Sequence, residues 1–185
     1  HINNVATHLK KKGRQFIKIR EPGGNRNSEK IRKLILSNKS NFNKITDLLL
    51  YLAARNENIE NIIKKNIGKK IILIDRFTDS TLAYQHYGMG ININFINTIN
   101  NFLLKNIKVS FTFLNLVNPK NMKFRLNQRK KLNRYDKFKM LFYKKVQSGF
   151  IKISNKNKKK YLKINSNSNI LINKKIIIKK INKLI

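Results

Sequence analysis

The stretch that decides the fold reads K-I-I-L-I-D-R and spans residues 70–76. Four apolar residues follow one another in it without alternation, which predicts a strand with both faces covered, as in a parallel sheet. Asp75 and Arg76 would then lie at the carboxyl end of that strand, where open α/β sheets bind their ligands. An Arg suits a phosphate there, because its planar guanidinium can make two charge-assisted hydrogen bonds at once. The alternative is an Asp–Arg pair that caps the next helix.

Strands and helices alternate on both sides of this stretch. Further strands are predicted over 15–19, 109–116 and 161–164, and helices are predicted to begin at Ser28, Thr46, Asp79 or Ser80, Asn92, Pro119, Tyr135 and Ile170. This alternation predicts an α/β fold in three layers, a parallel sheet flanked by helices, as a single domain over residues 1–185. Because the first segment, 2–12, is itself helical, we expect the first strand of such a sheet to be absent from this chain. The strands beside the gap would then expose apolar surface and unpaired backbone.

The amino-acid composition bears on whether the chain has a nucleic-acid partner. The chain carries 42 Lys and Arg against 8 Asp and Glu, and the resulting net charge of +34 invites a nucleic-acid partner. Lys, Ile and Asn together make up 90 of the 185 residues, while Ala occurs four times, as AT-rich codons would produce in any protein. We therefore expect no specific nucleic-acid partner. A basic nucleic-acid-binding protein stays open as the alternative.

The lack of Cys and the lack of a long apolar run exclude further kinds of site and protein. The chain has no Cys, which excludes disulfides, thiolate metal sites and Cys nucleophiles within it and fits a reducing, cytoplasmic setting. No run approaches eighteen apolar residues, so we expect no membrane span. The basic final helix could lie on a membrane surface, but the sequence favours the alternative, in which this helix covers the sheet. No two His residues have metal-ligand spacing.

Other residue groups could carry binding chemistry. The loop R-E-P-G-G at 20–24 follows a predicted strand, and its glycines would let the backbone approach a ligand, although such a loop is often a plain turn. Tyr51 and Arg55 stand four apart on one helix face, where they could grip a flat base or pack in the core. The basic stretch 125–134 could form a mobile lid over phosphates or a solvated charge run.

Four stretches, in this order and spacing, resemble thymidylate kinase, the nucleoside-monophosphate kinase that makes dTDP from dTMP and ATP. They are R-E-P-G-G at 20–24, L-L-L-Y-L-A-A-R at 48–55, I-D-R-F-T-D-S-T-L-A-Y-Q at 74–85 with G-M-G at 88–90, and R-K-K-L-N-R-Y-D at 129–136. The resemblance implies a fold of the phosphate-loop nucleoside-monophosphate-kinase type. It also implies a cytoplasmic homodimer that phosphorylates dTMP with ATP and Mg²⁺ in dTTP biosynthesis. The lid segment, residues 126–136, resembles the arginine-rich bacterial type.

The resemblance implies an acceptor site for dTMP built from residues of three of these stretches. Its members would be Arg20 and Pro22 in the wall of the site, Tyr51 stacked on thymine, Arg55, Thr81 and Gln85 on the base edge, Tyr84 against the sugar, and Arg76 on the phosphate.

The donor side is implied in the same way. Arg125 would lie on the adenine side of ATP, and Arg129 and Arg134 near the transferring phosphates. Asp75 would lie near the phosphates and hold Mg²⁺ through water, so that Asp75, Arg76, Arg129 and Arg134 form the catalytic group. One position departs from the family: Asn133 stands where many bacterial members carry Asp, so the lid would lose a salt bridge there.

The phosphate loop of the family is a second departure. Its motif G-x-x-G-x-G-K-[ST] does not occur in the 185 residues. That loop supplies the backbone amides and the Lys that hold the β- and γ-phosphates. We therefore expect this chain to be a fragment and to be inactive as written.

The charge generates a first test. If the codon usage of the source explains the +34, the chain should bind DNA weakly, without sequence preference, and with an affinity that falls steeply as salt rises, because counterion release drives it. Fluorescence anisotropy with two unrelated duplexes at several salt concentrations measures this. Tight binding to one duplex alone at physiological salt would favour the nucleic-acid alternative.

Overall fold

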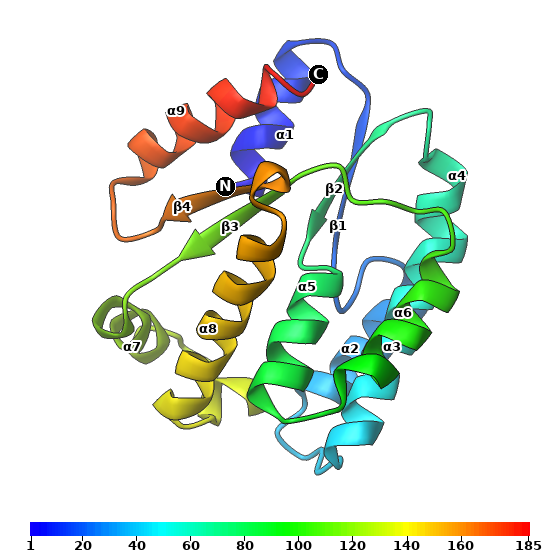
Figure 1. Cartoon of the computed structure of the whole chain (residues 1–185), viewed down its shortest axis with the longest axis vertical. Coiled ribbons are helices and arrows are strands. Elements are labelled where there is room, and N and C mark those ends of the chain that lie inside the picture. Colours follow the sequence, from blue (N-terminus) through cyan, green and yellow to red (C-terminus); the bar gives the residue numbers. More distant parts are fainter.

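The computed structural model describes residues 1–185 and contains four short parallel strands. They are β1 (Phe16–Arg20), β2 (Ile71–Asp75), β3 (Thr112–Leu116) and β4 (Tyr161–Asn165). β1 pairs with β2 in a register that sets Phe16 opposite Ile71, and β3 pairs with β4 in a register that sets Thr112 opposite Tyr161. Helices surround the strands, so the predicted α/β fold with parallel strands is confirmed (Figure 1).

The four strands do not form one continuous sheet. The two pairs are separate two-stranded sheets, and the described residues supply no strand that connects them. The four apolar residues of β2, Ile71 to Ile74, are accordingly only partly buried, although their pattern is that of a fully covered strand. Each pair therefore keeps free edges with unpaired backbone groups.

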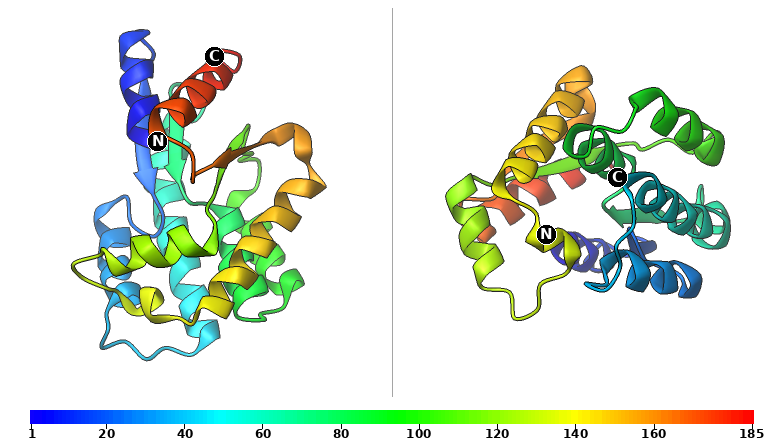
Figure 2. Two further views of the ribbon diagram at one scale, coloured as in Figure 1. Left: turned by 90° about the vertical axis from the view of Figure 1, so that its left-hand side faces the viewer. Right: turned by 90° about the horizontal axis from the view of Figure 1, so that it is seen from below.

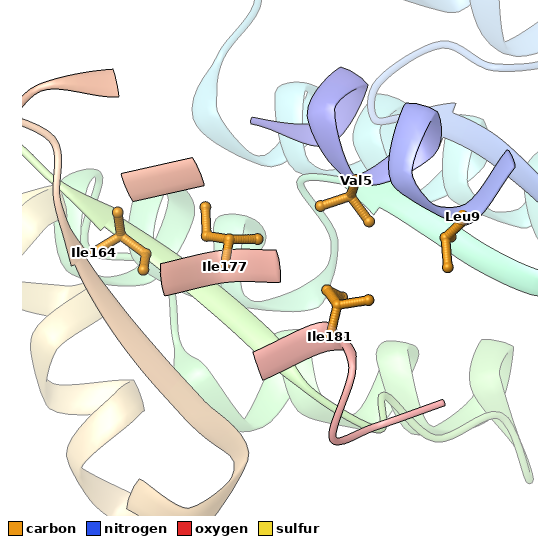
Figure 3. Close-up of a cluster of buried hydrophobic side chains, with 5 residues drawn as sticks. All are labelled: Val5, Leu9, Ile164, Ile177 and Ile181. Carbon is orange, nitrogen blue, oxygen red and sulfur yellow. The ribbon is translucent and has the colours of Figure 1, made fainter. Parts of the chain in front are cut away.

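An apolar cluster bridges the two strand pairs. Helix α1 (Ile2–Lys11) and helix α9 (Ile170–Ile181) contribute four of its five buried residues, and β4 contributes the fifth, as Figure 3 shows: Val5, Leu9, Ile164, Ile177 and Ile181. Partly buried residues of both pairs pack against this cluster, among them Leu73 from β2 and Phe113 from β3. Burial of apolar area, and not a backbone ladder between strands, thus joins the two strand pairs at this end of the molecule.

The remaining helices cover the other faces (Figures 1 and 2). They are α2 (Arg26–Leu36), α3 (Lys44–Asn58), α4 (Lys64–Asn66), α5 (Thr78–Thr81), α6 (Ile93–Leu104), α7 (Pro119–Asn127) and α8 (Met140–Lys156). A π-helical turn joins α3 to α4, and α5 continues as a π-helical segment over Leu82–Gly88. Helix α8 packs tightly on the segment Leu82–Gly88, because a Cβ on Gly149 would lie only 2.6 Å from the Tyr87 ring. None of the helices combines the length and the apolarity that crossing a bilayer requires.

Asparagine caps most of these helices, and this corrects several predicted starts. The side chain of Asn25 accepts the backbone N–H of Ser28, and that of Asn43 accepts those of Ile45 and Thr46. The starts predicted at Ser28 and Thr46 were therefore wrong by a few residues, since an Asn carbonyl caps as well as a hydroxyl. The start at Pro119 is confirmed.

The long helix predicted from Tyr135 was wrong at its start. Residues Arg134–Lys137 form a short 3₁₀ helix, and α8 begins only at Met140. The lid segment therefore ends in a short turn that is separate from α8. Figure 2 shows this segment at the opposite end of the molecule from α1 and α9.

The bridging cluster generates a stability test with a neighbouring control. Ile177 is 2% exposed, whereas Ile176 on the same helix is 44% exposed. We expect Ile177→Ala to lower the free energy of unfolding by about 2–5 kcal/mol, because it leaves a cavity between the two halves. Ile176→Ala should change it by no more than about 0.5 kcal/mol. Urea denaturation of both variants measures the difference, and equal effects would show that the cluster does not join the halves.

Candidate active site

The loop after β1 is fixed by α3. The Glu21–Pro22 peptide bond is cis, and Gly23 and Gly24 have φ of +113° and +122°. Asn58 of α3 donates its amide to the Gly23 carbonyl at 2.6 Å, and a Cβ on Gly24 would lie 2.5 Å from the Asn58 Oδ1. The glycines therefore let the loop approach this helix closely. That contact holds Arg20, at the end of β1, and Pro22 beside α2 and α3.

Arg55 is the hub of the site. It is 1% exposed, and its Nε donates to Glu21 Oε2 at 2.8 Å, its Nη1 to Asn100 Oδ1 at 2.7 Å and its Nη2 to Thr81 Oγ1 at 2.9 Å. The loop after β1, α3, α5 and α6 thus meet at one guanidinium. Burial raises the pKa of Glu21, although the charge and hydrogen bond of Arg55 act in the opposite direction. Sequence reasoning missed Asn100, because nothing separates it from the 28 other Asn residues.

Three tyrosines line the next part of the site. The rings of Tyr51 and Tyr84 each lie edge-on to the ring of Tyr135, with centroid distances of 6.0 and 6.1 Å. Gln85 Nε2 lies 3.5 Å from the Tyr135 hydroxyl. Burial raises the pKa of Tyr51 to about 12, so its hydroxyl stays neutral at physiological pH. Tyr51, Tyr84 and Gln85 thus all lie against Tyr135, which reaches them from the lid segment.

Three guanidinium groups converge beside the tyrosines. Arg76, at φ +65°, lies with its guanidinium 5.2 Å from the centre of the Tyr84 ring. Arg32 of α2 donates to the Pro22 carbonyl at 2.6 Å, and its pKa is lowered, chiefly by burial and then by the charges of Arg20 and Arg76. Glu29 lies 3.3 Å from Arg20 and offsets part of this repulsion. Converging cations of this kind form a site for an anion such as phosphate.

Arg32 was missed by the sequence analysis. The signal that could have found it is the choice of residue, because the chain uses 33 Lys but only nine Arg. An Arg kept in such a composition marks a place where a bidentate donor is needed.

Arg125, just before the lid segment, and the two lid arginines are all bonded by the chain itself. Arg125 Nη2 donates to the Ser166 carbonyl at 2.6 Å, Arg129 forms an ion pair with Asp136, and Arg134 forms one with Asp47. Asn133 caps the 3₁₀ helix, and Asp136 accepts its backbone N–H in return. The lid segment therefore contains an internal ion pair, Arg129 with Asp136, although position 133 carries no charge.

Asp75 is the one acidic side chain at the end of β2, and it is exposed. Its backbone carbonyl accepts the Glu21 N–H at 2.9 Å. No group of three or more His, Asp or Glu residues in the chain could form a metal cage. The single carboxylate fits Mg²⁺, which commonly keeps most of its waters and binds through one or two carboxylates and substrate phosphates.

Known proteins resemble this chain over most of its length. Residues 1–177 match the family model described as thymidylate kinase. The chain belongs to the thymidylate kinase family. A thymidylate kinase of Thermosipho africanus is 37% identical over 154 residues, which cover 83% of this chain and 76% of that protein. One from Sulfurihydrogenibium sp. is 36% identical over 179 residues, covering 96% of this chain and 87% of the relative.

A solved structure supports the same conclusion. The crystal structure of thymidylate kinase from Ehrlichia chaffeensis superimposes with a TM-score of 0.78 at 27% identity, covering 97% of this chain and 89% of that chain. The fold is therefore that of a nucleoside-monophosphate kinase, and the thymidylate kinase family makes this chain a member of that enzyme class.

The Arg55 hub generates a pH-dependent stability test. Arg55→Met leaves Glu21 buried without its partner, so the free energy of unfolding should fall by about 3–5 kcal/mol at pH 7. The raised pKa of Glu21 should then rise further, and a Glu with a raised folded pKa contributes stability that is lost as pH rises above its ordinary value of 4.5. The loss should accordingly be smaller at pH 5 than at pH 7.

Chemical denaturation at both pH values measures the effect. Arg14→Met is the control, because Arg14 is exposed and bonds only the Ile185 carbonyl. An Arg55→Met variant with the same loss at both pH values would contradict the buried-pair account.

Proposed function

We propose that this chain binds dTMP as the acceptor of a reaction that, with ATP, Mg²⁺ and a phosphate loop, converts dTMP to dTDP for dTTP biosynthesis. The observation that carries the proposal is the convergence of Arg20, Arg32 and Arg76 beside the rings of Tyr51 and Tyr84. A cluster of guanidinium groups next to a wall of aromatic rings suits a ligand with a phosphate at one end and a flat base at the other.

The base side of the proposed site uses the hub. Tyr51 stacks on thymine, Tyr84 lies against the sugar, and Thr81 and Gln85 bond the base edge. Three of the five N–H groups of Arg55 are taken by the chain, which leaves two donors for the base. Arg20 and Pro22 wall the site, and Arg76 with Arg32 bonds the phosphate.

The donor side relies on the lid segment. We propose that Arg129 and Arg134 exchange their carboxylate partners for ATP phosphates, and that Arg125 lies on the adenine side. Asp75 holds Mg²⁺ through water, and the ion supplies neutralisation of phosphate charge. Catalysis then rests on positioning and charge neutralisation and needs no covalent intermediate.

Exposed apolar side chains support the proposed homodimer. Helix α3 exposes Ile45 and Leu49, and helix α6 exposes Phe95 and Phe102, of which Phe102 is 73% exposed. Apolar groups on neighbouring helices suit a self-association face. We also propose cytoplasmic function without a membrane or a specific nucleic-acid partner.

Phosphate transfer needs a group that holds the β- and γ-phosphates in line. No phosphate-loop motif occurs among the 185 residues, so we propose that the 185-residue chain binds the acceptor but does not transfer phosphate. Positioning of reacting groups can lower the activation free energy of a reaction by about 7–11 kcal/mol. Without a group that positions the phosphates, we expect no measurable turnover.

Calorimetry on the 185-residue chain tests the acceptor site. We expect dTMP to bind at least about tenfold more tightly than dCMP or dAMP, because one mismatched buried hydrogen bond costs about 1–3 kcal/mol. Arg76→Ala should abolish binding, whereas Arg14→Ala, the same change outside the candidate site, should not. Equal affinity for the three nucleotides would overturn the base-recognition roles.

A coupled ADP assay tests the reaction. The 185-residue chain should be silent with ATP and dTMP, and a version preceded in frame by a strand and a glycine-rich phosphate loop should produce ADP. Activity of the shorter version would overturn the mechanism, and silence of a folded longer version would overturn the function.

A further inference from the structure

Asp47 is a buried carboxylate that no role described so far requires. It lies in the first turn of α3 and is 2% exposed. Its Oδ1 forms the ion pair with Arg134, and its Oδ2 accepts the Tyr135 hydroxyl at 2.9 Å. Both partners come from the end of the lid segment, 87 and 88 residues further along the chain.

The groups around Asp47 hold Arg134 and Tyr135 of the lid segment in one position. A buried carboxylate is tolerated only with charged or hydrogen-bonding partners, and the N-terminal turn of α3 also favours a negative charge. The Arg134 guanidinium lies 5.7 Å from the centre of the Phe42 ring and 5.2 Å from that of Tyr135. Tyr143 of α8 holds the Tyr135 carbonyl with its hydroxyl at 2.7 Å. The segment Arg134–Tyr135 is thus clamped between α3 and α8.

The clamp places Tyr135 in the acceptor site. Its ring lies edge-on to Tyr51 and Tyr84, the two rings to which the proposed function gives the base and the sugar. Burial, followed by the influence of Tyr51 and Asp47, raises the pKa of Tyr135, so the hydroxyl remains a donor to Asp47. Withdrawal of the lid segment would remove this third ring from the wall of the site.

We propose that Asp47 is a positioning residue that anchors the lid segment to α3 through Arg134 and Tyr135, and that Tyr135 so held is the third wall of the acceptor site. The inference rests on the proposed function for the identity of the ligand. Arg134 then acts first as an anchor and is available to phosphates only when Asp47 releases it.

The anchor and the ligand must stabilise one another. If the anchored lid raises the affinity for dTMP, dTMP must strengthen the anchoring by the same factor, because coupling between two equilibria is reciprocal. Trypsin reports on the anchoring, since Arg129, Lys130 and Lys131 lie exposed in the lid segment just before the clamp. Calorimetry measures the affinity of the acceptor site for dTMP.

The test compares Asp47→Asn with matched variants of the 185-residue chain. Asp47→Asn should speed trypsin cleavage within 129–131 and weaken dTMP binding, each by at least about fivefold, the lower end of usual coupling. Tyr135→Phe, which keeps the ring and removes the hydroxyl bond, should act in the same direction with a smaller effect. Asp47→Glu, which keeps the charge, should restore most of both properties. Glu60→Gln, which breaks an exposed pair with Lys64, should change neither.

Addition of dTMP separates positioning from mere stability. It should slow lid cleavage in the unaltered chain and in Glu60→Gln but not in Asp47→Asn. A folded Asp47→Asn chain with unaltered cleavage and affinity would overturn the proposal, and if that variant does not fold, the same result for Tyr135→Phe would do so. If neither the unaltered chain nor any variant binds dTMP, the proposed function is wrong. Faster cleavage of Asp47→Asn than of Glu60→Gln would in that case still support the anchoring of the lid segment by Asp47.

Discussion

A buried guanidinium holds the acceptor side of this molecule together. Arg55 joins the loop after β1, helix α5 and helix α6 to its own helix through Glu21, Thr81 and Asn100. A buried charge without partners costs several kcal/mol, so each of these elements is held in the position that the hub requires. Tyr51 and Tyr84 of the candidate site stand on α3 and on the segment that continues α5, so the placement of both rings depends on a contact that no ligand supplies.

The rest of the molecule is joined by more exchangeable contacts. The two strand pairs meet through the apolar cluster of α1 and α9 rather than through shared backbone hydrogen bonds. On the lid side, the exposed side chains of Arg125 and Arg129 bond the Ser166 carbonyl and the Asp136 carboxylate, and water and phosphate can compete for an exposed guanidinium. A rigid acceptor side and a lid with replaceable partners is the division that phosphoryl transfer needs, since the lid must move and the acceptor must not.

Local sequence signals predicted β2 and the start of α7, because the apolar run at 71–74 favours a strand and the proline at 119 suits the first position of a helix. They failed where structure depends on distant residues. The helix starts were shifted because Asn, with 29 copies, carries no distinguishing signal for a cap, and the break at 138–139 follows from the clamp on Asp47. In the site, Tyr51, Tyr84 and Gln85 were found together, whereas Arg32, Asn100 and Asp47 were missed because only the tertiary fold gives them partners. Residue choice was the overlooked clue, since seven of the nine Arg residues lie in the candidate site or the lid.

Hydrogen–deuterium exchange with and without dTMP tests most directly whether these residues form an acceptor site. Ligand binding protects the backbone whose opening would break the site. The account predicts that dTMP slows exchange in 20–24, 48–55, 76–85 and 133–136, and leaves α1 and α9 unchanged. Unchanged exchange in all four segments at a dTMP concentration that saturates the chain, or protection confined to the α1 and α9 end, would contradict it.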